Sequence, residues 1–104
     1  MKKIMLVLAV LVLVVAAAFA YNATNITTAT TTTIKTGSTF LSHIVVNGGT
    51  MGQISVWDNN ASGGTVIATI ASPLAGQTYV YDAGLALGCK VVTADNTNLT
   101  VLWQ

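Results

Sequence analysis

His43 and Cys89 are the two side chains of this chain best suited to move a proton or attack a substrate near neutral pH. His43 is the only histidine among 104 residues and stands in the apolar run "FLSHIVV". A general base or a metal ligand needs partner groups, and the sequence offers no zinc-type spacing or paired carboxylates around it. We therefore interpret His43 as a strand residue that alternates with Leu41 and Val45 and faces solvent or a neighbouring subunit.

Cys89 is the single cysteine, so the chain cannot form an internal disulfide. Lys90 beside it could lower the pKa of the thiol and make it reactive. An unpaired cysteine more commonly packs as a small hydrophobic residue, and we expect that role for Cys89. Because we expect structural roles for both Cys89 and His43, we predict that the protein is not an enzyme and uses no cofactor.

Two aspartates are candidates for a metal site because they stand in oxygen-rich turns. Asp58 begins "DNN" and Asp95 begins "DNTN", and calcium takes oxygen ligands from loops of this kind. Neither stretch has the spacing of an EF-hand loop, and Asp and Asn are also the ordinary residues of β-turns. Asp58 and Asp95 are therefore calcium candidates that turn formation alone would also explain.

Charged residues are scarce, with four Lys, three Asp and a formal net charge of +1. Beyond Ala20, two Lys stand against three Asp, which leaves a charge of −1. Nucleic-acid recognition needs several cationic side chains on phosphates, so we expect no specific nucleic-acid partner. A surface of low net charge favours association, which predicts a homo-oligomer or a protein bound in a lattice.

The first 20 residues form an apolar segment with two interpretations. Lys2 and Lys3 precede an unbroken apolar run, Ile4–Ala20, and the final "AFA" fits a signal-peptide cleavage site. A membrane-spanning helix needs about 20 apolar residues, a length that the run approaches if it continues to Ala23. A retained helix would place these side chains in the membrane: Ile4, Leu6, Leu8, Leu11, Leu13, Val15 and Phe19.

After Gly37 the pattern is typical of short β-strands separated by turns. The range 21–36 is rich in Thr and Asn, and we expect a stalk that becomes an edge strand near 32–36. For 37–104, a turn signal every 8–12 residues predicts an all-β domain. The expected fold is a small antiparallel β-sandwich or jelly-roll-like barrel of seven or eight strands, preceded by one N-terminal apolar helix over residues 1–20.

Large aromatic side chains on these strands are candidates for an interface. If exposed, they would be anchors for a partner, and if buried, they would form the core of a thin sandwich. Trp57 is out of phase with Ile54 and Val56, which predicts an exposed position or an intersubunit contact. The candidates are Trp57, Tyr79, Tyr81 and Trp103.

Several short sequence motifs occur in a fixed order between Thr36 and the end of the chain. They are Trp57-Asp58-Asn59, the strand Ser62–Ile70, Tyr81-Asp82 and Thr100-Val101. In this order and spacing, about two-thirds of the chain resembles a family of small β-sandwich proteins of bacteriophages. The resemblance implies a structural virion protein, such as a decoration, fibre-base or minor capsid component. The apolar N-terminal segment departs from the family pattern.

A retained anchor suits a phage with an internal membrane, where small single-pass proteins tether the lipid to the icosahedral shell. The resemblance then implies capsid or other virion proteins and the lipid membrane as partners, with Lys2 and Lys3 pointing towards the packaged DNA. The alternative is a secreted bacterial β-sandwich, cleaved after Ala20, that binds a surface or a glycan. In that case Trp57, Tyr79 and Tyr81 would form its binding platform.

Overall fold

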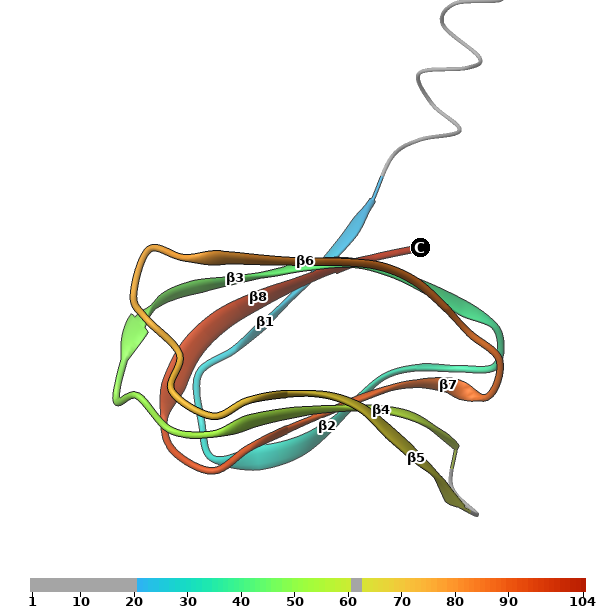
Figure 1. The fold of residues 1–104 in the computed structure, drawn as a ribbon, viewed down its shortest axis with the longest axis horizontal. Coiled ribbons are helices and arrows are strands. Elements are labelled where there is room, and N and C mark those ends of the chain that lie inside the picture. The colour runs from blue at the N-terminus through green and yellow to red at the C-terminus, as the bar shows by residue number, and fades with distance from the viewer. Residues whose placement is uncertain (1–20, 61–62) are drawn as a thin grey trace, which may run out of the picture.

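The computed structural model describes residues 21–60 and 63–104, and within these ranges the chain forms eight strands. The strands form two antiparallel four-stranded sheets, with the orders β1-β8-β3-β6 and β2-β7-β4-β5, which stack face to face (Figure 1). The all-β prediction is confirmed, and the helix expected over residues 1–20 lies outside the described residues. The strands are β1 (Asn22–Ile26), β2 (Thr30–Thr36), β3 (Thr39–Gly49), β4 (Ile54–Asn60), β5 (Gly63–Ile70), β6 (Thr78–Leu85), β7 (Gly88–Thr93) and β8 (Thr97–Trp103).

The strand pairs are nested within one another along the chain. β4 pairs with β5, β3 with β6, β2 with β7 and β1 with β8, all antiparallel. Two further pairings, β3 with β8 and β4 with β7, join these pairs into the two sheets. The first and last strands are therefore neighbours, and each sheet has two edges: β1 and β6 in one, β2 and β5 in the other.

Alternation of apolar and polar residues decides which side of each strand is buried. On β8, Leu99 and Val101 are fully buried, whereas Asn98 and Thr100 between them are only partly buried. The core is built mainly from the four central strands β3, β8, β4 and β7. The buried apolar residues are Ile26, Leu41, Ile44, Val46, Ile54, Val56, Ile70, Leu85, Cys89, Val91, Leu99 and Val101.

A β-bulge in β3 changes which of its residues face the core. Against β8, Leu41 and His43 lie opposite the consecutive residues Trp103 and Leu102, so Ser42 is an extra residue of β3 on that side. The register with β6 also shifts here, but there the extra residue is on β6, because Leu41 lies opposite Ala83 and His43 opposite Val80. Leu41 and Ile44 are therefore both fully buried, although they are three residues apart, whereas His43 and Val45 are only partly buried. His43 therefore keeps the expected alternation with Val45 on the outer side of the strand, whereas the bulge breaks its alternation with Leu41.

The range 21–36, for which we expected a stalk, belongs to the sandwich instead. Its residues form β1 at the edge of one sheet and β2 at the edge of the other, and the second agrees with the edge strand expected near 32–36. β1 lacks an apolar pattern, and Ile26 is its one buried residue. Backbone pairing with β8 holds β1 in place, and composition does not reveal such pairing.

Candidate interaction surfaces

Asp58 fixes a turn at one end of the sandwich. Its carboxylate lies near the end of β4 and accepts hydrogen bonds from the backbone N–H groups of Leu87 at 2.8 Å and Ala86 at 3.2 Å. These donors belong to the turn between β6 and β7. The Leu87 hydrogen bond lowers the pKa of Asp58, partial burial opposes that effect, and the bonds from Ala86 and Gly88 add to it.

Asp95 lies at the opposite end of β4 and cannot share a metal ion with Asp58. β4 pairs with β7 from Ile54 opposite Thr93 to Asp58 opposite Cys89, and Asp95 follows Thr93 in the next turn. There its backbone carbonyl accepts a hydrogen bond from Thr97 N–H at 2.8 Å. Within 21–60 and 63–104, no cluster of three His, Cys, Asp or Glu could hold a metal. The turn role therefore accounts for both aspartates in the described residues.

Cys89 is a core residue, and its thiol is unreactive. It is fully buried on β7. Burial raises the pKa of its thiol to about 11, and the nearby Asp58 charge adds to the effect. The thiolate is the reactive form of cysteine, so Cys89 stays protonated and unreactive at neutral pH. Lys90 does not activate it.

His43 lies on the outer face of its sheet rather than in a catalytic group. Its ring packs edge-on against Tyr21, with centroids 6.4 Å apart, and Nδ1 is 2.8 Å from Ser42 Oγ. Across the sheet His43 is paired with Leu102 on β8 and with Val80 on β6. This row is mostly apolar and brings no carboxylate to the imidazole, and the one hydroxyl beside it, that of Ser42, is itself buried.

A polar cluster occupies another part of the same outer face. Asn98 Oδ1 accepts hydrogen bonds from the side-chain amides of Asn25 at 2.9 Å and Asn47 at 3.2 Å. Asn47 also donates to Thr100 Oγ1 at 3.1 Å. Because these groups satisfy one another across β1, β8 and β3, they strengthen strand pairing and leave few free groups for a ligand.

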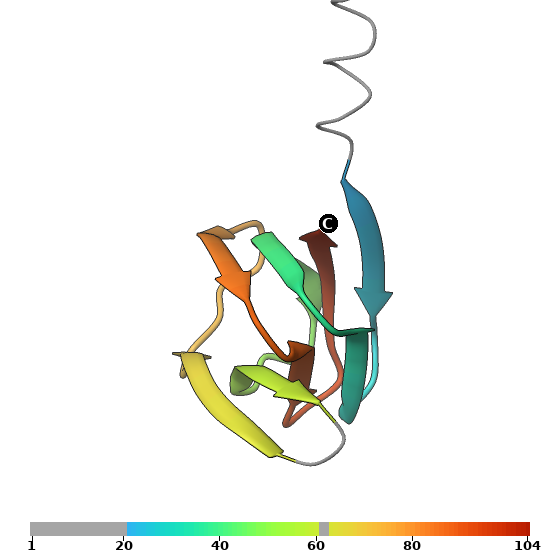
Figure 2. The ribbon, with the colours of Figure 1, turned by 90° about the vertical axis from the view of Figure 1, so that its right-hand side faces the viewer.

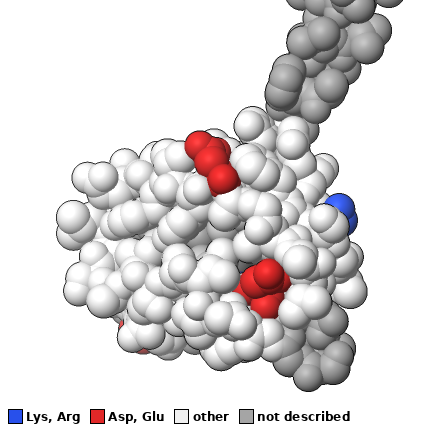
Figure 3. All heavy atoms as spheres, turned by 45° about the vertical axis from the view of Figure 1, so that its right-hand side comes forward, with Lys and Arg blue, Asp and Glu red and all other residues white. Residues whose placement is uncertain are grey.

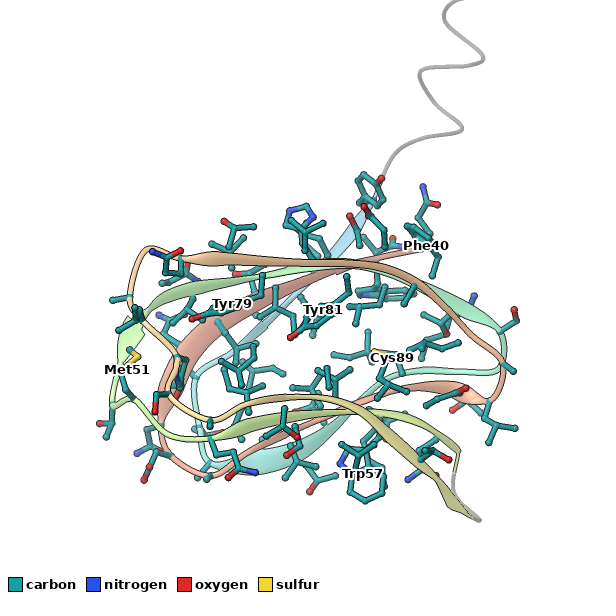
Figure 4. All side chains as sticks on the ribbon, in the orientation of Figure 1. Phe40, Met51, Trp57, Tyr79, Tyr81 and Cys89 are labelled. Carbon is teal, nitrogen blue, oxygen red and sulfur yellow. The ribbon has the colours of Figure 1, made fainter. Side chains whose placement is uncertain are left out.

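Three of the four aromatic candidates pack against the core. Tyr79 and Tyr81 lie on β6 and point between the two sheets (Figure 4). Leu74 N–H donates a hydrogen bond to the Tyr79 hydroxyl at 3.2 Å, and burial raises the pKa of Tyr81, with a further contribution from Tyr79. Trp103 Nε1 donates to Thr24 Oγ1 at 3.0 Å, which links β8 to β1.

Trp57 lies on the outer face of the other sheet, away from the core (Figure 4). Its neighbours across the sheet are Lys90 on β7 and Val66 on β5. Its Nε1 and the Oδ1 of Asn59 are buried without a hydrogen-bond partner in the described part of the chain. A buried polar atom without a hydrogen-bond partner lowers the free energy of unfolding by about 1–3 kcal/mol. The two unpaired atoms therefore destabilise this stretch of β4 in the single chain.

Exposed aliphatic side chains on two edge strands were not identified as candidates from the sequence. Val66 and Ile67 on β5 are 42% and 40% exposed, and Val80 on β6 is 65% exposed. Each continues an apolar pattern that fits a buried strand equally well, so only the strand order reveals the exposure. The face of the molecule drawn in Figure 3 carries few charged groups.

Comparison with known proteins gave no match to a family model, a curated protein or a solved structure. The resemblance to phage virion proteins therefore stays a prediction. The described residues contain no helix that is both long and apolar enough to span a membrane. The anchor residues expected from the sequence, Ile4 to Phe19, lie outside the described ranges. What the geometry defines is a small two-sheet sandwich whose candidate features are surfaces for association.

Proposed function

We propose that this chain is a structural virion protein: a minor capsid protein of a phage with an internal membrane, anchored by its N-terminal helix and packed through its sandwich against the capsid shell. The observation that carries the proposal is the nested pairing of β1 with β8, β2 with β7, β3 with β6 and β4 with β5. This is the strand order of a jelly roll, which recurs in viral capsid and lectin domains. Because a fold alone does not define a function, the proposal also rests on the surface of the sandwich and on the N-terminal segment.

The described surface supports adhesion rather than catalysis. The two residues best suited to chemistry do not meet, since Cys89 is in the core and His43 is on an outer face. The charged residues of the described ranges are two lysines and three aspartates. A nearly uncharged β-sandwich is poorly protected against association, and this property suits a protein that functions in a packed lattice.

The position of β1 supports a short tether. The apolar run ends at Ala20 and β1 begins at Asn22, so Tyr21 alone separates them. If the run stays in a bilayer, the sandwich is held against the membrane surface, between the lipid and the shell. Tyr21, which is 47% exposed, would occupy the interfacial zone that aromatic residues favour.

The first test is the intact mass of the protein from its native source, together with its partitioning between detergent and aqueous phases. We expect the mass of Met1–Gln104 and recovery in the detergent phase. In a density gradient of the same material, the protein should sediment with particles that contain lipid and nuclease-protected DNA. A mass that begins at Tyr21, recovered in the aqueous phase and absent from particles, would refute the proposal.

A secreted glycan-binding module is the second candidate, since jelly rolls also occur in lectins. Trp57 on the outer face of β4 is the observation in its favour, because the part of a half-buried indole that reaches solvent can stack against a sugar ring. Tyr79 and Tyr81 point between the sheets (Figure 4) and so do not contribute to a platform. A glycan array probed with the cleaved form tests this function, and binding that Trp57→Ala abolishes would establish it.

A further inference from the structure

The strand β5 has an unprotected edge. It pairs with β4 on one side and borders no other described strand on the other (Figure 2). An edge strand presents a row of unpaired backbone N–H and C=O groups that another strand can pair with. Proteins ordinarily block such edges with charges, prolines, bulges or short strands.

Each of the other three edge strands carries a protective feature that β5 lacks. β1 has five residues, β2 contains Lys35 and a register shift, and β6 contains Asp82 and a register shift. β5 has eight residues with no charge and no proline. Its one protective feature is a β-bulge at Ile67, which has no partner on β4.

Side chains on both faces of β5 reach solvent. Residues 64–67 are all exposed, and consecutive strand residues point to opposite faces of a sheet. Val66 and Ile67 thus expose apolar groups at 42% and 40% beside a row of unpaired backbone groups. The backbone specifies the kind of partner that covers this edge, namely another β-strand.

We propose that β5 pairs with the β5 strand of a second copy, antiparallel about a two-fold axis, and so joins two β2-β7-β4-β5 sheets into one continuous sheet. A symmetric pairing brings residues of the same strand opposite one another. A two-fold axis at Lys35 of β2 or Asp82 of β6 would place like charges opposite one another. β5 has no charge at any position, and its Thr65, Val66, Ile67 and Thr69 form favourable cross-strand pairs. The −1 charge of the chain beyond Ala20 adds little repulsion between copies.

This inference is independent of the proposed function, because the edge is the same whether residues 1–20 are retained or removed. Sedimentation velocity of the full chain in detergent provides the test, with Val66→Lys as the variant. Val80→Lys is the matched control, since Val80 is 65% exposed on β6, an edge strand of the other sheet. We expect a dimer whose dissociation constant rises at least about tenfold in Val66→Lys, because like charges then meet across the axis, and is unchanged in Val80→Lys.

A cross-linking measurement keeps the test decisive if Val66→Lys also affects folding. Cysteine is placed singly at Thr65, Val66 or Ile67, with Val80→Cys as the control, and the native Cys89 does not compete because it is buried. Intermolecular disulfides should form on β5 and not at position 80. A wild-type monomer at micromolar concentration, equal weakening by the two lysine variants, or equal cross-linking at position 80 would overturn the proposal.

Discussion

Asp58 exemplifies how single side chains work in a chain with few charges: they complete the backbone hydrogen bonds of turns. Thr97 Oγ1 donates to the Thr50 carbonyl at 2.6 Å, and Thr93 Oγ1 donates to the Thr28 carbonyl at 2.7 Å. Hydroxyl and carboxylate groups thus satisfy loop atoms that the sheets leave unpaired. The abundance of Thr and Asn in the sequence serves the fold at these positions.

Replacement of Asp58 by alanine should lower the melting temperature at neutral pH, because the N–H groups of Ala86 and Leu87 lose their acceptor. The pKa of Asp58 is lowered by folding, so its stabilising effect is complete above the unfolded value of 3.8 and disappears as the pH falls through the folded value. The difference between wild type and Asp58→Ala should therefore shrink below about pH 3.8. Calorimetry at several pH values measures it.

Asp95→Ala is the control for that experiment, since Asp95 contributes its backbone carbonyl rather than its carboxylate to the neighbouring turn. Its melting temperature at neutral pH should be close to that of wild type. A difference for Asp58→Ala that stays constant down to strongly acidic pH would show that the charge is not the stabilising feature.

At the scale of elements, the turns depend on a few positions where the backbones of neighbouring strands approach closely. Gly88 begins β7 with φ = +147°, and a Cβ built there would lie 2.6 Å from the Lys35 carbonyl and 2.8 Å from the Asn59 carbonyl. Both contacts are with backbone atoms of other strands, which cannot move independently. A glycine is thus needed where β2, β4 and β7 meet.

Gly88→Ala should reduce the free energy of unfolding by about 2–4 kcal/mol, because the added methyl group clashes with backbone on two sides. Gly84→Ala on β6 is the matched control, since a Cβ there meets nothing within 4 Å. Chemical denaturation of the two variants compares them directly. Equal stabilities would mean that the strands around Gly88 can separate without cost.

The sequence predicted those elements whose apolar residues alternate, and it did not predict features that arise between strands. Alternation on the later strands indicated a β-sandwich. The phase of Trp57 predicted an exposed position or an intersubunit contact, and its side chain lies partly buried on an outer face. The same alternation on β6 could not decide whether Tyr79 and Tyr81 face the core or a partner. The bulge at Ser42 and the pairing of β1 depend on neighbouring strands that are distant in sequence, so local patterns do not encode them.

At the scale of the whole molecule, the core is small for a domain that stands alone. Twelve apolar residues are buried in the described ranges, and a domain of this size buries only about 60% of the surface of its unfolded chain. Partners that bind the folded state add stability by mass action. Association through β5 and packing in a shell would therefore both contribute to the stability of the working protein.

If β5 pairs two copies, the thermal midpoint of the full chain should depend on its concentration. A hundredfold increase in concentration should raise the midpoint by about 4–8 °C, because unfolding must also separate the dimer. Scanning calorimetry of wild type and Val66→Lys measures this, and the midpoint of the variant should depend less on concentration over the same range. A wild-type midpoint that does not change with concentration would contradict association at this edge.

The placement of β1 also determines how the sandwich responds to mechanical load. A tether that pulls at Tyr21 transmits tension first to β1, whose Asn22 is opposite Trp103. Tension across the strand would break the β1–β8 hydrogen bonds one after another, beginning beside the Trp103–Thr24 bond, whereas tension along the strand would load all of them together. Loss of β1 removes Ile26 alone from the buried core. If a tether pulled at Tyr21, we expect β1 to be the first strand to lose its pairing, with the pairing among the seven other strands unchanged.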